Sequence, residues 1–154
     1  MNIVIISVGK KHSSEFADAI AMYEKRFASK HAITWSLINP AIGGGLQQVD
    51  EESYKILNSL KPTDYVILLD ETGNNLSNQQ FAKIFDQTIT DGSIGRIVFI
   101  IGGAFGVNAE LKARAHYVWS LSKLVFPHQL VRLILIEQLY RTVSILNNHP
   151  YHHQ

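Results

Sequence analysis

Hydrophobic and polar positions follow two alternating periods along the chain. Five mostly apolar runs, rich in β-branched residues, have the length and character of strands covered on both faces; they lie at 2–8, 32–38, 64–70, 95–101 and within 117–126. Between them apolar residues recur every three or four positions, as in amphipathic helices; these helices are expected at 13–27, 49–60, 77–89, 108–115 and 129–146. The alternation predicts an α/β fold, a parallel sheet of five to six strands with helices on both faces.

Two segments between these elements have the composition of loops. Residues 40–48 include three consecutive glycines, whose ordering costs conformational entropy, so a mobile loop is expected there. Residues 71–75 read ETGNN and are expected to form a turn. No repeat, low-complexity segment or linker interrupts the chain, so residues 1–154 are expected to form a single domain.

Composition narrows the class of protein. With 154 residues, 46% hydrophobic and 18% charged, the chain can bury a core and lies outside the disordered range. No apolar run is long enough to span a membrane, and the start, MNIVIISVGK, is expected to be a strand rather than a signal peptide. Because the chain has no cysteine, disulfides, thiol nucleophiles and zinc ribbons are excluded. We expect a cytoplasmic protein.

The net charge of +1 conceals an uneven distribution of charge along the chain. Residues 1–110 carry 9 Lys and Arg against 12 Asp and Glu, whereas 111–154 carry five basic residues, one acidic residue and five of the seven histidines. A polyanion would therefore favour the C-terminal part, although a solvated basic face is an equally good interpretation.

Ligand sites in parallel sheets lie at the carboxyl ends of the strands. Three segments that follow predicted strands are therefore candidates for a ligand site. In FIIGGAFG, Gly102 and Gly103 let backbone N–H groups approach a ligand, although a tight turn explains them equally well. In LSKLVFPHQL, Pro127 removes a donor and holds Phe126 extended, so apolar side chains there could enclose a flat ring. The third segment, LLDETG, contains two acids that could be ordinary solvated turn residues.

A set of motifs resembles one known family over the whole length. IGGAFG, followed by SLSKLVFPHQLVR, LIEQLYR and the final NHPYH, is similar to the RlmH family, as are the opening VGK and the YEKRF helix. These are bacterial SPOUT-class methyltransferases that act on N3 of a pseudouridine in helix 69 of the 23S ribosomal RNA, in the assembled ribosome. The resemblance therefore implies the same activity here.

The resemblance also implies structure and partners. It implies a trefoil knot in the C-terminal part, a cofactor, S-adenosyl-L-methionine, bound in the knot loops, and a homodimer in which one subunit's tail lies near the other's cofactor. Together with the glycine loop, it indicates the following cofactor-binding residues: Leu69, Gly102, Gly103, Leu121, Ser122, Lys123, Leu124, Val125 and Phe126. The 40–48 loop is shorter and less charged than the family pattern leads us to expect.

Methylation of an imide nitrogen requires removal of its proton and stabilisation of the resulting charge. The C-terminal part supplies five candidate catalytic residues: His128, Arg132, Arg141, Tyr151 and His152. Arg141 could stabilise negative charge on the uracil oxygens, His152 or a water could accept the proton, and Tyr151 could stack on the base. His128 is more often a capping or packing residue than a base. A metal site in the histidine-rich tail is not expected, because the tail has no carboxylate or cysteine partner.

The helix at 129–146 is apolar around its whole circumference near 130–136, which exceeds the stripe that one subunit's core needs. We therefore expect it to contact a second copy across a two-fold axis. Two other functions remain open, a SPOUT methyltransferase that acts on transfer RNA and a non-catalytic ribosome- or RNA-binding module with the same fold.

Overall fold

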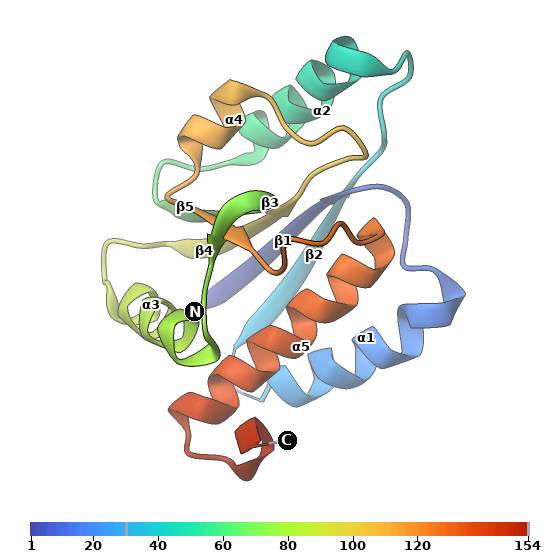
Figure 1. Cartoon of the computed structure of the whole chain (residues 1–154). Helices are drawn as coiled ribbons and strands as arrows, with labels where there is room; N and C mark the ends of the chain where they lie inside the picture. The colour runs from blue at the N-terminus through green and yellow to red at the C-terminus, as the bar shows by residue number, and fades with distance from the viewer. Residues whose placement is uncertain (30, 154) are drawn as a thin grey trace.

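One parallel sheet occupies the centre of the molecule (Figure 1). The computed structural model describes residues 1–29 and 31–153, with side chains at each of these except 152 and 153. The strands are β1 (Asn2–Val8), β2 (Ala32–Ile38), β3 (Asp64–Asn75), β4 (Arg96–Ile101) and β5 (Tyr117–Ser120). Their order in the sheet is β2-β1-β4-β3-β5, and every pairing is parallel. The predicted parallel sheet is confirmed, with five strands among the described residues.

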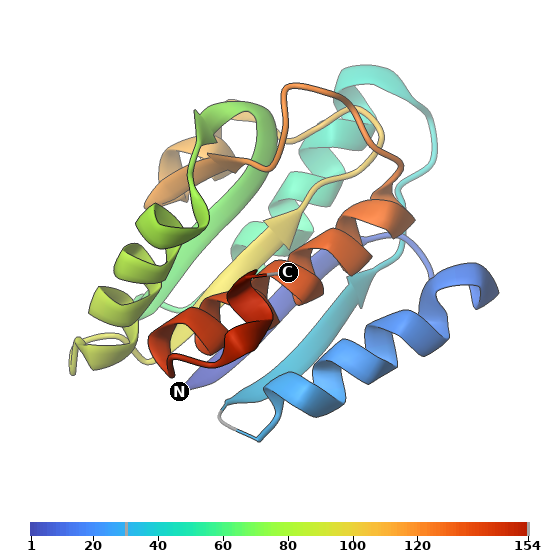
Figure 2. The same ribbon diagram turned by 60° about the horizontal axis from the view of Figure 1, so that its bottom comes forward.

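Helices cover both faces of this sheet, as predicted (Figures 1 and 2). The first face carries α1 (Ser14–Phe27), α3 (Asn78–Thr90) and α5 (His128–Leu146), and the second carries α2 (Gly45–Ser59) and α4 (Ala109–Arg114). The central strands β1 and β4 are buried on both faces, which explains why their sequences are continuously apolar. The edge strand β2 is only partly buried. None of the described helices is long and apolar enough to cross a membrane.

The register brings three strand ends to one place on the sheet edge. Leu69 of β3 pairs with Ile101 of β4 on one side and with Trp119 of β5 on the other. The segments that follow these three residues therefore leave the sheet next to each other, although they lie far apart in the sequence.

The predicted turn at 71–75 is wrong, because β3 continues through it to Asn75. The pairing of β3 with β5 shifts between Leu69 and Asn74, so the intervening residues bulge out of the ladder. The Asn75 amide then donates to the carbonyl oxygen of Ser120 at 2.9 Å and rejoins the two strands. Gly73 is needed here, since a Cβ at this position would lie 2.5 Å from the carbonyl oxygen of Val118.

The predicted loop at 40–48 is also too long, because residues 45–48 form the first turn of α2. Gly43, Gly44 and Gly45 have φ angles of 121°, 69° and 62°, a region that glycine adopts without steric cost. The three glycines are thus explained by backbone geometry at the start of a helix. At the other end of the chain, η1 (Pro150–His153) is a 3₁₀ turn folded back on α5 (Figure 2).

Candidate active site

The three strand-end segments enclose one cavity of about 510 Å³, a volume typical of small-molecule sites. Its lining comes from the end of β3, the glycine turn after β4, α4, and the segment between β5 and α5. The residues are Leu68, Leu69, Asp70, Glu71, Thr72, Ile101, Gly102, Gly103, Ala104, Phe105, Gly106, Val107, Lys112, Trp119, Leu121, Ser122, Leu124, Val125, Phe126, His128 and Val131. Segments that the sequence indicated separately thus form one site.

The glycine turn after β4 has a fixed shape. The N–H of Gly106 donates to the carbonyl oxygen of Gly103 at 3.1 Å, and Gly106 has a φ of 78°. A Cβ on Gly103 would collide with a carboxylate oxygen of Glu52, a buried residue of α2. Glu52 cannot simply move away, because its other oxygen accepts the N–H of Ala41 at 3.0 Å and the amide of Gln48 at 2.9 Å. Gly103 therefore has to be a glycine.

The segment between β5 and α5 forms the opposite wall. The Ser120 hydroxyl donates to the carbonyl oxygen of Ser122 at 2.9 Å, and the Ser122 hydroxyl accepts the N–H of Leu124 at 3.0 Å. These bonds hold the chain open after the strand, and Leu124 and Val125 remain 70% and 79% exposed. Apolar side chains that are held at the cavity in this way suit a flat ring that lies against them.

The third wall contains charged and hydroxyl groups. Asp70 accepts the N–H and the hydroxyl of Thr72 at 2.8 and 2.6 Å, and Lys112 donates to the same hydroxyl at 3.0 Å. Burial alone would raise the pKa of Asp70, but the bonds from Thr72 and the charge of Lys112 outweigh it and lower that pKa. Asp70 is thus an ionised part of this wall rather than a solvated turn residue.

The cavity contains eight of the nine residues predicted to bind the cofactor. The exception is Lys123, whose side chain is exposed outside the lining. Sequence reasoning missed Thr72, Phe105 and Lys112, each of which lines the cavity. Thr72 and Phe105 are close in sequence to predicted residues, so the sequence could have indicated them. Nothing in the sequence indicated Lys112, because only the packing of α4 brings it to this site.

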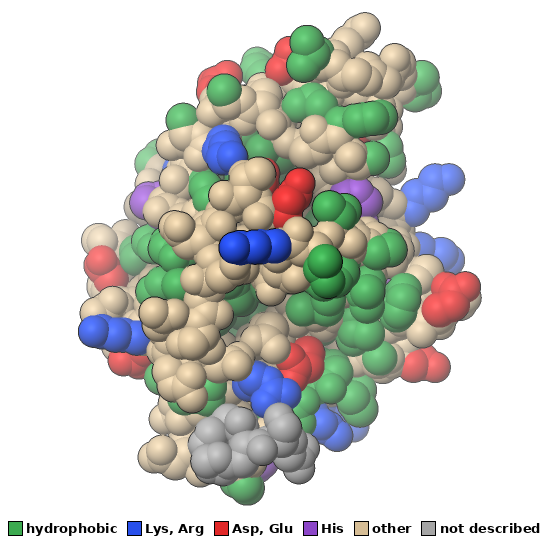
Figure 3. All heavy atoms as spheres, viewed as in Figure 1, with side chains coloured by type: hydrophobic (Ala, Val, Ile, Leu, Met, Phe, Trp, Pro, Cys, Tyr) green, Lys and Arg blue, Asp and Glu red, His purple; other side chains and the backbone are tan. Residues whose placement is uncertain are grey.

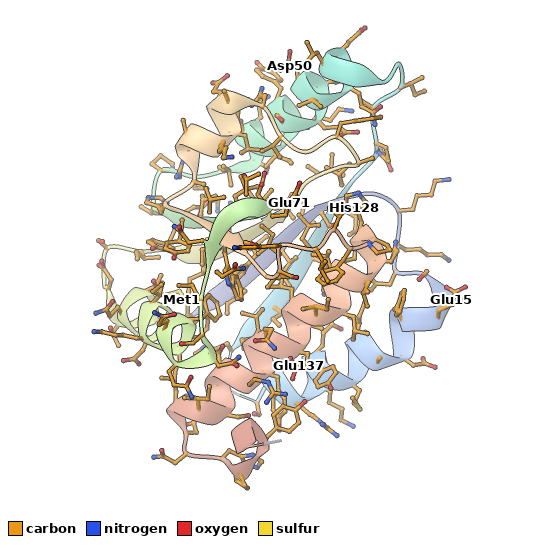
Figure 4. The ribbon with its side chains drawn as sticks, in the orientation of Figure 1. Met1, Glu15, Asp50, Glu71, His128 and Glu137 are labelled. Carbon is orange, nitrogen blue, oxygen red and sulfur yellow. The ribbon has the colours of Figure 1, made fainter. Side chains whose placement is uncertain are left out.

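Among the predicted catalytic residues whose side chains the structure describes, His128 alone lines this cavity. It begins α5 directly after Pro127, and Glu71 lines the same cavity (Figure 4). Burial and the charge of Arg132 lower the pKa of His128, against the opposing effect of Glu52. The imidazole of His128 is therefore neutral at neutral pH, and a neutral imidazole is able to accept a proton.

Arg132, also predicted to be catalytic, lies outside the cavity lining. Its side chain is fully buried, its Nε donates to the Ser7 hydroxyl at 3.0 Å, and its Nη1 donates to the carbonyl oxygen of Lys10 at 2.8 Å. It leaves little room beside Gly9, where a Cβ would lie 2.9 Å from its Nη2. Arg132 therefore joins α5 to the loop after β1 and is absent from the cavity lining.

Arg141 and Tyr151 lie together elsewhere on α5. Arg141 forms an ion pair with Glu137 at 2.6 Å, and its guanidinium carbon lies 5.0 Å from the centre of the Tyr151 ring. The Tyr151 hydroxyl lies 3.2 Å from both a Glu137 oxygen and the Tyr23 hydroxyl. The side chain of His152, predicted to be catalytic, lies outside the described residues, as does that of His153. His149 accepts the N–H of Tyr151 at 3.3 Å.

Among the predicted catalytic residues, His128 lies at the start of α5, whereas Arg141, farther along α5, lies beside Tyr151 of η1. His128 and Arg141 are thirteen residues apart on α5, so a rise of about 1.5 Å per residue separates them by roughly 20 Å. Figure 4 shows His128 at the start of α5 and Glu137 farther along it. Within one chain, Arg141 and Tyr151 do not line the cavity.

Comparison with known proteins identifies the class. A family model described as "Predicted SPOUT methyltransferase" matches residues 1–152. In structure, the chain is similar to a probable methylase family protein from Haemophilus influenzae, with a TM-score of 0.52 and 15% identity, covering 95% of this chain and 66% of that one. This likeness supports the fold alone.

Curated relatives narrow the family further. Ribosomal RNA large subunit methyltransferase H of Parabacteroides distasonis is 38% identical, and that of Chromobacterium violaceum is 37% identical, each over 100% of both chains. The protein of the same name from Parasynechococcus marenigrum is 40% identical over 96% of this chain and 94% of the relative. The chain belongs to the SPOUT methyltransferases, within the family of ribosomal RNA large subunit methyltransferase H.

Proposed function

We propose that this protein transfers a methyl group from S-adenosyl-L-methionine to N3 of a pseudouridine in helix 69 of 23S ribosomal RNA, in the assembled ribosome. The main support is the combination of full-length similarity to large-subunit methyltransferases with one cavity at the ends of β3, β4 and β5. The cavity supplies a place for the cofactor, and the relatives' names supply the class of RNA.

The residues at this cavity fit the cofactor. Gly102 and Gly103 line the cavity with backbone alone, Leu124 and Val125 supply apolar contact for the adenine, and Asp70 supplies a carboxylate for a cationic or hydroxyl group. When bound, S-adenosyl-L-methionine supplies an electrophilic methyl group, so the protein's task is to orient the reactants and to exclude water.

The protein must also make N3 nucleophilic. An imide N–H has to lose its proton before or during attack, and a positive charge near the uracil oxygens favours that loss. We assign charge stabilisation to Arg141, stacking on the base to Tyr151, and acceptance of the proton to His152, to a water or to His128. The trefoil knot implied by the family belongs to this proposal as the structure that holds the loops around the cofactor.

A homodimer reconciles the two groups of residues. Because about 20 Å separates them along α5, we propose that the tail of one subunit completes the cavity of the other. α5 offers a contact surface, since Leu130 and Ile134 are half-buried and one helical turn apart.

The charge of the protein favours the ribosome over free RNA as the substrate. On the face in Figure 3, charges of both signs are interspersed. With a net charge of +1, each chain has only a weak electrostatic attraction for free RNA. The assembled ribosome is therefore the proposed substrate.

Mass spectrometry of helix 69 tests this proposal. In cells that lack the protein, one pseudouridine should lose a single methyl group, and expression of the intact chain should restore it. In vitro, purified protein with S-adenosyl-L-methionine should methylate ribosomes from these cells and leave their free 23S RNA largely unmodified.

Other outcomes identify the rival functions. An unchanged helix 69 together with loss of a methyl group from transfer RNA would identify a transfer RNA methyltransferase. Absence of any affinity for S-adenosylhomocysteine in calorimetry would identify a binding module without catalysis.

A further inference from the structure

Glu137 of α5 contacts both Arg141 and Tyr151, two residues that the proposed function places at the RNA base. One of its carboxylate oxygens accepts Nε and Nη2 of Arg141 at 3.0 and 2.6 Å and lies 3.2 Å from the Tyr151 hydroxyl. Its other oxygen accepts the side-chain amide of Gln138 at 2.6 Å. A single carboxylate thus contacts both tail residues to which the proposed function assigns a role in catalysis.

The sequence makes this carboxylate unusual. Glu137 is the one acidic residue within 111–154, a region with five basic residues and five histidines. It lies outside the cavity lining, so it has no part in holding the cofactor. An acid in a region that should attract RNA opposes binding of a polyanion, and another task is needed to account for it.

The geometry indicates that task. Glu137 precedes Arg141 by four residues, the favourable order for an ion pair on a helix, and the two side chains are only 18% and 17% exposed. Partial burial strengthens such a pair relative to one at the surface. Because Arg141 also lies over the Tyr151 ring, holding its guanidinium in place restricts the ring as well.

Neighbouring elements hold this arrangement in place. The Tyr151 hydroxyl contacts the Tyr23 hydroxyl of α1, and the Gln138 amide oxygen accepts the Asn78 amide of α3 at 2.7 Å. Tyr140 packs against Tyr151, with ring centres 4.7 Å apart. The carboxylate is thereby linked to α1 and α3 as well as to its own helix. Backbone hydrogen bonds such as that from the His149 N–H to the Ser144 carbonyl oxygen, at 2.8 Å, hold the start of the tail, and the carboxylate and these rings hold Tyr151.

We propose that Glu137 is the positioning residue of the tail, which sets the orientation of the Arg141 guanidinium and the Tyr151 ring before the RNA base arrives. This inference rests on the proposed function, since it assumes that Arg141 and Tyr151 meet the base. Glu137 itself touches neither the cofactor nor the base. A tail that is oriented in advance does not have to be ordered during the reaction.

The test replaces Glu137 by glutamine in the full-length protein. Glu137→Gln keeps the shape and one acceptor oxygen but removes the charge that holds Arg141. Displacing a catalytic group by about 1 Å costs up to roughly a hundredfold in rate. We expect kcat for methylation of ribosomes to fall by about ten- to a hundredfold, with little change in KM or in affinity for S-adenosylhomocysteine.

A matched control and a spectroscopic readout separate positioning from folding. Glu51→Gln removes the acid of another i,i+4 ion pair, with Lys55, that is exposed on α2, and kcat should stay unchanged. Burial, the bond with Tyr23 and the charge of Glu137 together raise the pKa of Tyr151. Absorbance titration of the tyrosines should therefore show one group that ionises at lower pH in Glu137→Gln and is lost in Glu137→Gln/Tyr151→Phe.

The remaining variants decide between outcomes. Glu137→Asp keeps the charge on a shorter side chain and should recover part of the lost kcat; it also replaces Glu137→Gln should that variant unfold. If Arg141→Ala and Tyr151→Ala lower kcat while Glu137→Gln does not, the positioning role is wrong and the proposed function stands. If Arg141→Ala and Tyr151→Ala both methylate ribosomes at the full rate, the catalytic tail and the role of Glu137 are both wrong.

Discussion

A carboxylate oxygen of Glu52 occupies the space that a Cβ on Gly103 would need. The two residues belong to α2 and to the turn after β4, and they meet at the back of the candidate cofactor cavity. Because Glu52 is bonded to Ala41 and Gln48, it acts as a rigid support for the glycine turn. The turn that is proposed to contact the cofactor is therefore shaped by a helix that does not line the cavity.

Gly103→Ala should weaken cofactor binding. The new methyl group forces either the turn or the bonded carboxylate to move, and overpacking of this kind typically costs about 1–3 kcal/mol. We expect calorimetry to show at least a tenfold loss of affinity for S-adenosylhomocysteine, while circular dichroism shows a folded protein. Gly92→Ala is the matched control, since a Cβ there meets nothing within 4 Å and should leave affinity unchanged. Equal affinities of the two variants would remove the turn from the cofactor site.

Ile134→Asp should dissociate the proposed dimer. Ile134 is half-buried and lies outside the core clusters, so an aspartate is tolerated in a single chain. Buried against a second copy, the unpaired charge costs several kcal/mol. Sedimentation velocity should show a folded monomer, whereas Leu46→Asp, at a position that is 84% exposed on α2, should leave the association state unchanged. A dimer that persists in Ile134→Asp would place the interface elsewhere. Leu135 is unsuitable for this test, because it is fully buried in its own core.

Deletion of residues 149–154 should separate catalysis from cofactor binding. Neither His149 nor Tyr151, nor any other described side chain of this segment, lines the cavity, so affinity for S-adenosylhomocysteine should be retained. Methyl transfer to ribosomes should fall by at least about a hundredfold, because acid–base groups typically contribute 10²–10⁴-fold. Tyr151→Ala should reproduce part of the loss, and Tyr54→Ala, which removes an exposed tyrosine from α2, should not. Full activity of the truncated protein would show that the tail has no catalytic role.

Acidification through the range in which histidines titrate should destabilise the fold. Burial lowers the pKa of His12, His116 and His128, so the unfolded chain, with histidines near pKa 6.5, binds protons first. Stability is therefore retained above about pH 6.5 and falls as the pH drops below it. The urea midpoint should decrease between about pH 7 and 5.

His116 offers a direct check of this pH dependence. Its Nδ1 accepts the N–H of Val66 at 2.9 Å and can do so only while it carries no proton. His116→Asn replaces this acceptor by an amide oxygen that does not titrate, so the midpoint should vary less with pH. An identical pH dependence in wild type and His116→Asn would show that this bond does not contribute to it.

Most of the secondary structure was predictable because it depends on neighbouring residues. Continuous apolar runs identified β1 and β4, which are covered on both faces, and three- or four-residue spacing identified the helices. Asn108 and Ser77 were recognisable as caps, and their side chains do accept the N–H groups of Leu111 and Gln80. The family motifs indicated three segments at strand ends, and these segments line one cavity because strand ends in a parallel sheet lie at one edge.

Most of what the sequence did not predict depends on contacts between residues distant in sequence. The segment 71–75 forms a strand because Asn75 pairs with β5 and Gly73 leaves room for it. The Arg132 side chain bonds to Ser7 and Lys10, more than 120 residues away, and these contacts fix its place outside the cavity. The Tyr151 hydroxyl meets that of Tyr23, 128 residues earlier. Local patterns predict which elements form, whereas the role of a single polar side chain is determined only when folding brings its partners to it.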